Sequence, residues 1–105
     1  MSGSRTPSGT SFSGMVADRK LTKNELIREI REMICSEYEA IKIYTKLAES
    51  TDDVVAKAVL LDIAEEEIVH AGEFLRLLKY LNPEEETFYQ KGAKEVEEMM
   101  KKVGK

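Results

Sequence analysis

The apolar residues between Val54 and Leu81 recur in steps that alternate between four and three. This spacing is typical of one face of a long helix packed against a partner. The same register, continued through the middle of the run, falls on Glu67 and His70, which are therefore expected on the buried seam, one turn apart. Because burial of an unpartnered charge is costly, something must compensate it, and a metal ion is the best candidate. The apolar positions are Ala56, Leu60, Ile63, Phe74, Leu77 and Leu81.

An earlier stretch with the same period predicts a first helix from Thr22 to about Ser50. Thr22 and Glu25 stand at the positions of a capping box, in which both side chains accept hydrogen bonds from backbone N–H groups at the helix start. The middle position of this helix's apolar seam is again a glutamate, Glu37. The other seam positions are Leu26, Ile30, Met33, Ala40, Tyr44 and Leu47.

Residues 50–53, Ser-Thr-Asp-Asp, break the pattern and supply capping residues for the second helix. A connection this short predicts that the two helices are antiparallel neighbours. In a hairpin centred on this turn, the numbers of two facing residues add up to about 103, and Glu37 with Glu67 meets this condition to within one residue. Glu37 is therefore expected level with the turn that carries Glu67 and His70.

The remaining segments complete one small domain. Residues 1–20 are rich in Ser and Gly, and we expect a disordered tail because they cannot bury enough apolar area to offset their conformational entropy. Asn82 and Pro83 are expected to end the second helix and to begin a short C-terminal helix. Gly92 is expected to interrupt this helix, which then resumes over residues 93–103. The sequence thus predicts an all-α domain over residues 21–105.

Composition restricts the partners and the compartment. The chain has 105 residues, a net charge of −4 and a single cysteine, Cys35. The acidic balance gives no reason to expect nucleic acid or an anionic membrane as a partner. The chain also contains no apolar run of membrane length and no signal-peptide core. One cysteine excludes an internal disulfide. We therefore expect a cytoplasmic protein with no nucleic acid and no membrane partner.

The three ligand-type residues make half of a known metal site. Carboxylate-bridged di-iron bundles take one Glu from each of two helices and a Glu-x-x-His turn from each of two others. This chain supplies only Glu37 and the turn Glu67–His70, and it contains one histidine. Two copies related by a two-fold axis complete both the ligand set and a four-helix bundle. This oxygen-rich set suits Fe²⁺ or Mn²⁺ better than a closed zinc site, although Mn or Zn is expected to bind in vitro.

Residues 21–103 resemble the encapsulated ferritin-like proteins, a two-helix branch of the ferritin superfamily. The residues that carry the resemblance are Glu37, Glu39 and Tyr44 in Ser-Glu-Tyr-Glu-Ala-Ile-Lys-Ile-Tyr, and Glu67 and His70 in Glu-Glu-Ile-Val-His. The passage Leu-Leu-Asp-Ile-Ala-Glu-Glu-Glu at 60–67, with Gly-Glu-Phe at 72–74 and Leu-Asn-Pro at 81–83, is similar to archaeal members fused ahead of a capsid-shell domain.

The resemblance implies a ferritin-like domain that is a ferroxidase, with a di-iron site shared across a dimer interface. It also implies ring-shaped decamers that act inside an encapsulin nanocompartment. Glu37, Glu67 and His70 match the family's iron ligands, Tyr44 its site tyrosine, and Glu39 an acidic residue on the iron entry route. The sequence departs from some members at Ser36 and Ile43, which lie near that route. Glu66, four residues before His70, is a candidate for orienting the imidazole.

Two other functions remain open from the sequence. One is a non-catalytic helical dimerisation module whose seam holds a structural metal. The other is a peroxide-scavenging di-iron protein like rubrerythrin, which would share the same ligands. The level placement of Glu37 with Glu67 and His70 favours the ferroxidase over the first, because a plain coiled-coil seam does not require it. The absence of the Cys-x-x-Cys pairs of a rubredoxin domain counts against the second.

Overall fold

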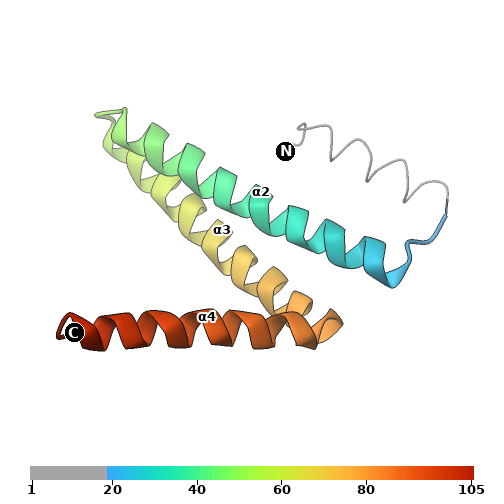
Figure 1. The fold of residues 1–105 in the computed structure, drawn as a ribbon. Helices are drawn as coiled ribbons and strands as arrows, with labels where there is room; N and C mark the ends of the chain where they lie inside the picture. Colours follow the sequence, from blue (N-terminus) through green and yellow to red (C-terminus); the bar gives the residue numbers. More distant parts are fainter. Residues whose placement is uncertain (1–18) are drawn as a thin grey trace.

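The computed structural model describes residues 19–105, which contain three helices and no strand: α2 (Lys23–Glu49), α3 (Val54–Leu81) and α4 (Pro83–Lys102) (Figure 1). This arrangement confirms the all-α prediction of an antiparallel hairpin followed by a C-terminal helix. The segment expected to be a disordered tail lies almost entirely outside the described residues. None of the described helices combines the length and hydropathy needed to span a bilayer.

The first two helices begin where the sequence predicts. The Thr22 hydroxyl accepts a hydrogen bond from the Glu25 backbone N–H at 3.1 Å, and the Glu25 carboxylate accepts one from the Thr22 N–H at 2.9 Å. Arg19 adds an ion pair to Glu25 at 2.6 Å. Helix α3 is capped by Asp53, whose carboxylate accepts from the Ala56 N–H at 2.8 Å. These caps satisfy backbone donors that a helix start leaves free.

Helices α2 and α3 run side by side and enclose a small apolar core (Figure 1). The buried side chains recur at intervals of seven on α3 and at intervals of three, four and fourteen on α2, which is the spacing of two helices packed at a shallow angle. They are Ile27, Ile30, Ile34 and Ala48 on α2, with Ala64, Ala71 and Leu78 on α3. Leu26, Phe74 and Leu81 pack against this core at its open end.

The predicted buried stripe of α3 is wrong at three positions, where the residue that is buried is the next one along the chain. Ala64, Ala71 and Leu78 are buried between the helices, where the periodicity predicted Ile63, His70 and Leu77. Both stripes share positions 60, 67, 74 and 81, so the spacing alone does not separate them. The apolar face of α3 is wider than the contact with α2. Within one chain, His70 therefore lies at the open edge of the hairpin, with its side chain 50% exposed.

Helix α4 is continuous through Gly92, contrary to the expected interruption. A glycine inside a helix costs only about 1 kcal/mol relative to alanine, which the flanking turns can offset. Asn82 is the N-cap residue, but its side chain makes no capping hydrogen bond. No residue of α4 is buried, and the Cα radius of gyration is 17.6 Å. A compact domain of this length has a radius of about 13 Å, so the chain is open and extended.

Candidate metal centre

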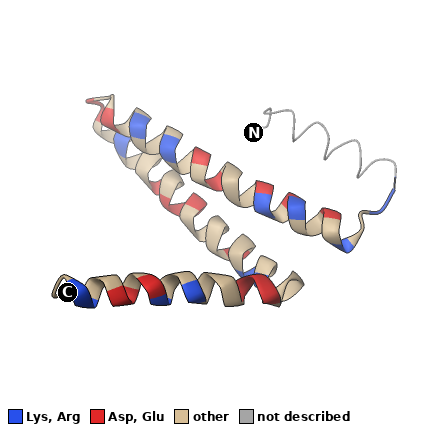
Figure 2. Cartoon of the chain, viewed as in Figure 1, with Lys and Arg blue, Asp and Glu red and all other residues tan. Residues whose placement is uncertain are grey.

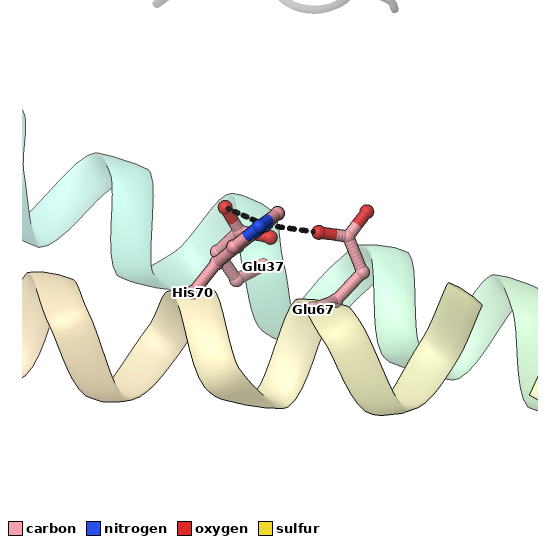
Figure 3. A group of neighbouring side chains, drawn as sticks. All are labelled: Glu37, Glu67 and His70. Atoms are coloured by element: carbon pink, nitrogen blue, oxygen red, sulfur yellow. Dashed lines mark hydrogen bonds and ion pairs between the residues drawn. The ribbon is translucent and has the colours of Figure 1, made fainter. Parts of the chain in front are cut away.

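Three ligand-type side chains from the two long helices converge at the edge of the hairpin. Glu37 comes from the middle of α2, and Glu67 and His70 come from adjacent turns of α3 (Figure 3). The antiparallel pairing of the helices brings Glu37 level with this turn, as the hairpin geometry predicts. The separation of three residues on α3 places Glu67 and His70 on the same side of that helix. One oxygen or nitrogen atom from each of the three residues lies within 4.8 Å of the others.

The imidazole of His70 lies between the two carboxylates (Figure 3). Its Nδ1 atom is 2.9 Å from Oε1 of Glu67, a hydrogen-bond distance, and 3.7 Å from Oε2 of Glu37. The side chains of Glu37 and Glu67 are 17% and 18% exposed, against 50% for His70. The hairpin thus covers most of the two carboxylates, whereas the imidazole faces the open side of the group.

The carboxyl of Glu37 is strongly affected by this environment. Its pKa is raised to about 7, mainly by desolvation and in addition by the hydrogen bond and the negative charge of Glu67. The nearby His70 opposes this shift without cancelling it. In the metal-free protein, Glu37 therefore holds a proton up to near-neutral pH. A cation at this position would neutralise the negative charges that the two carboxyl groups carry when both are deprotonated.

The pKa of His70 is raised above its usual value, first by the hydrogen bond to Glu67 and then by the charges of Glu37, Glu67 and Glu73. With the imidazole protonated, Nδ1–H donates to the Glu67 carboxylate.

The helix around the site is acidic over a wider range: between Lys57 and Arg76, α3 carries five acidic residues and no lysine or arginine (Figure 2). The acidic residues are Asp62, Glu65, Glu66, Glu67 and Glu73. Such a charge distribution attracts cations.

The donor set fits a divalent transition metal. Two carboxylates and one imidazole are the ligand types that suit iron, manganese or zinc. Glu37 and His70 can ligate a metal only in their deprotonated forms, so protons and a metal compete for these two groups. Three side chains on the open edge of one hairpin leave further coordination positions free. The arrangement can therefore bind a cation and also admit a second set of ligands.

The other predicted site residues lie outside this group. Tyr44 is on the same face of α2, two turns beyond Glu37, and is partly buried. The side chain of Glu39 is 60% exposed and lies 3.7 Å from Nζ of Lys42, an ordinary surface pair. Glu66 is exposed on α3 and makes none of the described hydrogen bonds. The roles of these three residues remain predictions.

One polar cluster had no signal in the sequence. Glu85, in the first turn of α4, meets Arg31 of α2 across 54 residues of chain. No local motif predicts such a pair, because its partners are neither adjacent in sequence nor on a common helix. It concerns the position of α4 rather than the metal ligands.

Comparison with known proteins identifies the class to which this fold and site belong. Residues 30–105 match the family model described as Rubrerythrin. A solved structure, the encapsulated ferritin domain from Pyrococcus furiosus, superposes with a TM-score of 0.75 at 41% identity, covering 77% of this chain and 83% of that one. The chain is therefore a member of the rubrerythrin family, with a ferritin-like fold.

Within that class, the relatives are associated by name with encapsulins. The chain is 40% identical over 82 residues to a ferritin-like–encapsulin shell fusion protein from Pyrococcus furiosus, covering 78% of this chain and 24% of that protein. It is 39% identical over 79 residues to an encapsulin nanocompartment cargo protein from Myxococcus xanthus, covering 75% and 60%. The resemblance to encapsulated ferritins is thus confirmed. The chain spans less than two thirds of either relative.

Proposed function

We propose that the protein is a ferroxidase that oxidises Fe²⁺ to Fe³⁺ at a di-iron site formed by Glu37, Glu67 and His70 of two copies of the chain. The observation that carries this proposal is the convergence of the three ligand atoms within 4.8 Å at an open edge of the hairpin. Two copies supply four carboxylates, which match the charge of two divalent ions. The same carboxylates stabilise Fe³⁺ more than Fe²⁺ and so favour loss of an electron to the oxidant.

The exposed apolar residues of a single chain also support the presence of a partner copy. Seven apolar residues are buried in the described part of the chain, whereas eighteen large apolar or aromatic residues are exposed, twelve of them on the hairpin. Monomeric proteins rarely leave so much apolar surface uncovered. Leu47 on α2 and Leu77 on α3 lie on the same apolar stripes as Glu37 and His70, ten and seven residues away from them, and are 53% and 38% exposed. A second hairpin placed on this edge would cover them and complete a four-helix bundle.

The relatives also support a cellular setting. One is named as a fusion to an encapsulin shell and another as an encapsulin cargo protein. We infer that this protein works in the cytoplasm, inside an encapsulin compartment, where the Fe³⁺ produced is stored as mineral. The family's ring-shaped decamer is the assembly that we expect there.

An anaerobic Fe²⁺ titration followed by admission of air tests the proposal. The parent protein is expected to bind one Fe²⁺ per chain and, on exposure to air, to develop ferric absorbance faster than free iron does. Glu37→Ala is expected to lose both properties. Glu49→Ala is the control, since Glu49 is an exposed glutamate of the same helix, α2, far from the ligand group. Parent-like oxidation by Glu37→Ala would show that Glu37 is not a ligand.

The same preparation separates the two alternative functions. The match to the rubrerythrin family favours a comparison of oxidants, so anaerobic protein loaded with Fe²⁺ is mixed with dioxygen or with hydrogen peroxide. A ferroxidase reacts with dioxygen over repeated additions of Fe²⁺. A peroxide scavenger reacts much faster with peroxide, and a structural metal site reacts with neither.

A further inference from the structure

The connection between the hairpin and α4 is short and carries little packing. A single residue, Asn82, separates the end of α3 from Pro83, the first residue of α4. Its backbone angles are φ −143° and ψ 72°, and its side chain makes no capping hydrogen bond. Because no residue of α4 is buried, apolar packing does not explain the direction in which this helix leaves the hairpin (Figure 1).

One carboxylate provides the polar contacts at this junction. Oε1 of Glu85 accepts hydrogen bonds from Nη2 of Arg31 at 2.6 Å and from Nδ2 of Asn82 at 3.1 Å. Nε of Arg31 lies 3.2 Å from both carboxylate oxygens, and the hydroxyl of Tyr89 donates to Oε2. The donors come from α2, from the junction and from the next turn of α4.

The Glu85 carboxylate is well placed to hold these donors together. Its side chain is only 14% exposed, so its ion pair with Arg31 is screened less than a pair at the open surface. Arg31 and then Tyr89 lower the pKa of Glu85, which keeps the carboxylate charged. Arg31 and Tyr89 also line a shallow apolar groove with Ile34, Tyr38, Leu75 and Leu78. Among the described residues, Arg31–Glu85 is the one ion pair between α4 and the hairpin.

We propose that Glu85 is a latch that fixes the direction of α4 relative to the α2–α3 hairpin. With the latch closed, the guanidinium of Arg31 holds the first turn of α4 against α2. Without it, the backbone at Asn82 is free to let α4 swing. The direction of α4 decides where its exposed apolar residues, among them Phe88, Val96 and Met99, are presented. None of the latch residues belongs to the group of Glu37, Glu67 and His70.

Pulsed electron spin resonance tests the proposal, because it measures the distance between a spin label on the hairpin and one on α4. One spin label is attached to the native Cys35, an exposed residue of α2, and the other to Lys101→Cys near the end of α4. Doubly labelled chains are diluted with an excess of unlabelled chains so that distances within one chain dominate. The parent is expected to give a narrow distance distribution. Glu85→Ala and Arg31→Ala are expected to broaden it and to shift its maximum.

Glu84→Ala is the matched control, because Glu84 is an exposed glutamate in the same first turn and takes no part in the described ion pair with α2. It removes the same charge from the helix start and is expected to leave the distribution unchanged. The double exchange Arg31→Glu with Glu85→Arg restores the ion pair but not the hydrogen bonds from Asn82 and Tyr89, so it is expected to give a distribution narrower than that of either alanine variant. The proposal is overturned if both alanine variants keep the parent distribution, or if Glu84→Ala broadens it equally. Circular dichroism checks that helix content is equal in all samples.

Discussion

On α3, the buried face and the open edge are one residue apart in the sequence. Ala64, Ala71 and Leu78 are closed off by α2, whereas His70 and Leu77, each one position earlier, face outward from the hairpin. The first face forms part of the core of the hairpin, and the second carries His70, one of the three proposed metal ligands. Helix α3 thus uses one stripe for the core of the hairpin and leaves the adjacent stripe exposed, which is where the proposed function places a partner copy.

The largest effect is expected from His70→Ala, on the open edge. Iron oxidation should fall by about 100-fold or more, because even residues that only support a ligand typically contribute 10–100-fold. Helix content should hardly change, since a half-exposed side chain is removed. Oxidation rates and far-ultraviolet circular dichroism measure the two effects, with Val69→Ala, an exposed neighbour, as the control. A parent-like rate in His70→Ala would exclude His70 as a ligand.

Neighbouring leucines give the second comparison. Leu78 is 2% exposed and Leu77 is 38% exposed. Leu78→Ala should lower the free energy of unfolding of the metal-free protein by about 2–5 kcal/mol, because it leaves a cavity in the core. Leu77→Ala should cost about 0.5 kcal/mol at low protein concentration, as at most surface positions. Urea unfolding measures both.

The partner copy sharpens this second comparison. The cost of Leu77→Ala should rise with protein concentration, because a second hairpin then covers this residue, whereas the cost of Leu78→Ala should not. Equal costs at low concentration would mean that the open edge is already part of the core of one chain. A cost of Leu77→Ala that stays constant with concentration would argue against a partner on this edge.

A smaller effect is expected from pH. The pKa of Glu37 is raised from 4.5 to about 7, and that of His70 is also raised. Both groups therefore bind more protons in the folded state than in the unfolded state. The stability of the metal-free protein should consequently fall as pH rises from about 4.5 to about 7. The metal-loaded protein should become more stable over the same interval, because its ligands must lose protons.

Urea unfolding at several pH values, with chelator or with Zn²⁺ as a redox-inert ion, checks this opposition. Glu37→Gln is the informative variant, since it keeps the shape of the side chain and removes its titration. The fall in stability of the metal-free protein should be smaller in this variant. Parallel pH profiles for the metal-free and metal-loaded proteins would contradict the account.

The helix boundaries and the hairpin can be predicted from the sequence because they depend on residues close to one another in the chain. The capping residues Thr22 and Asp53 predict where the first two helices begin, and Pro83 predicts where α4 begins. The meeting of Glu37 with Glu67 follows from the length of the turn alone. These features depend on residues a few positions apart or on simple hairpin geometry, and the structure reproduces them.

The errors have physical causes. A period of four and three does not tell His70 from Ala71 as the buried neighbour of Glu67, because the apolar face of α3 is wide enough to include both. Gly92 weakens a helix without ending it, so its effect depends on the flanking residues. The contact between Arg31 and Glu85 joins distant parts of the chain and leaves no periodic trace. Long-range polar contacts of this kind require the structure.

Dissociation with and without Fe²⁺ is the most direct test of whether two copies of the chain share the metal centre, as we propose. Under anaerobic conditions, the oligomer is diluted and its mass is followed for the parent and for Glu67→Ala. A shared site would crowd the carboxyl groups of two copies together in the metal-free protein and so disfavour association, whereas bound Fe²⁺ would neutralise them and bridge the copies. We predict that Fe²⁺ raises the association constant of the parent and has little effect on Glu67→Ala. Equal gains in both proteins, or a well-folded monomer that retains its iron, would contradict the shared site.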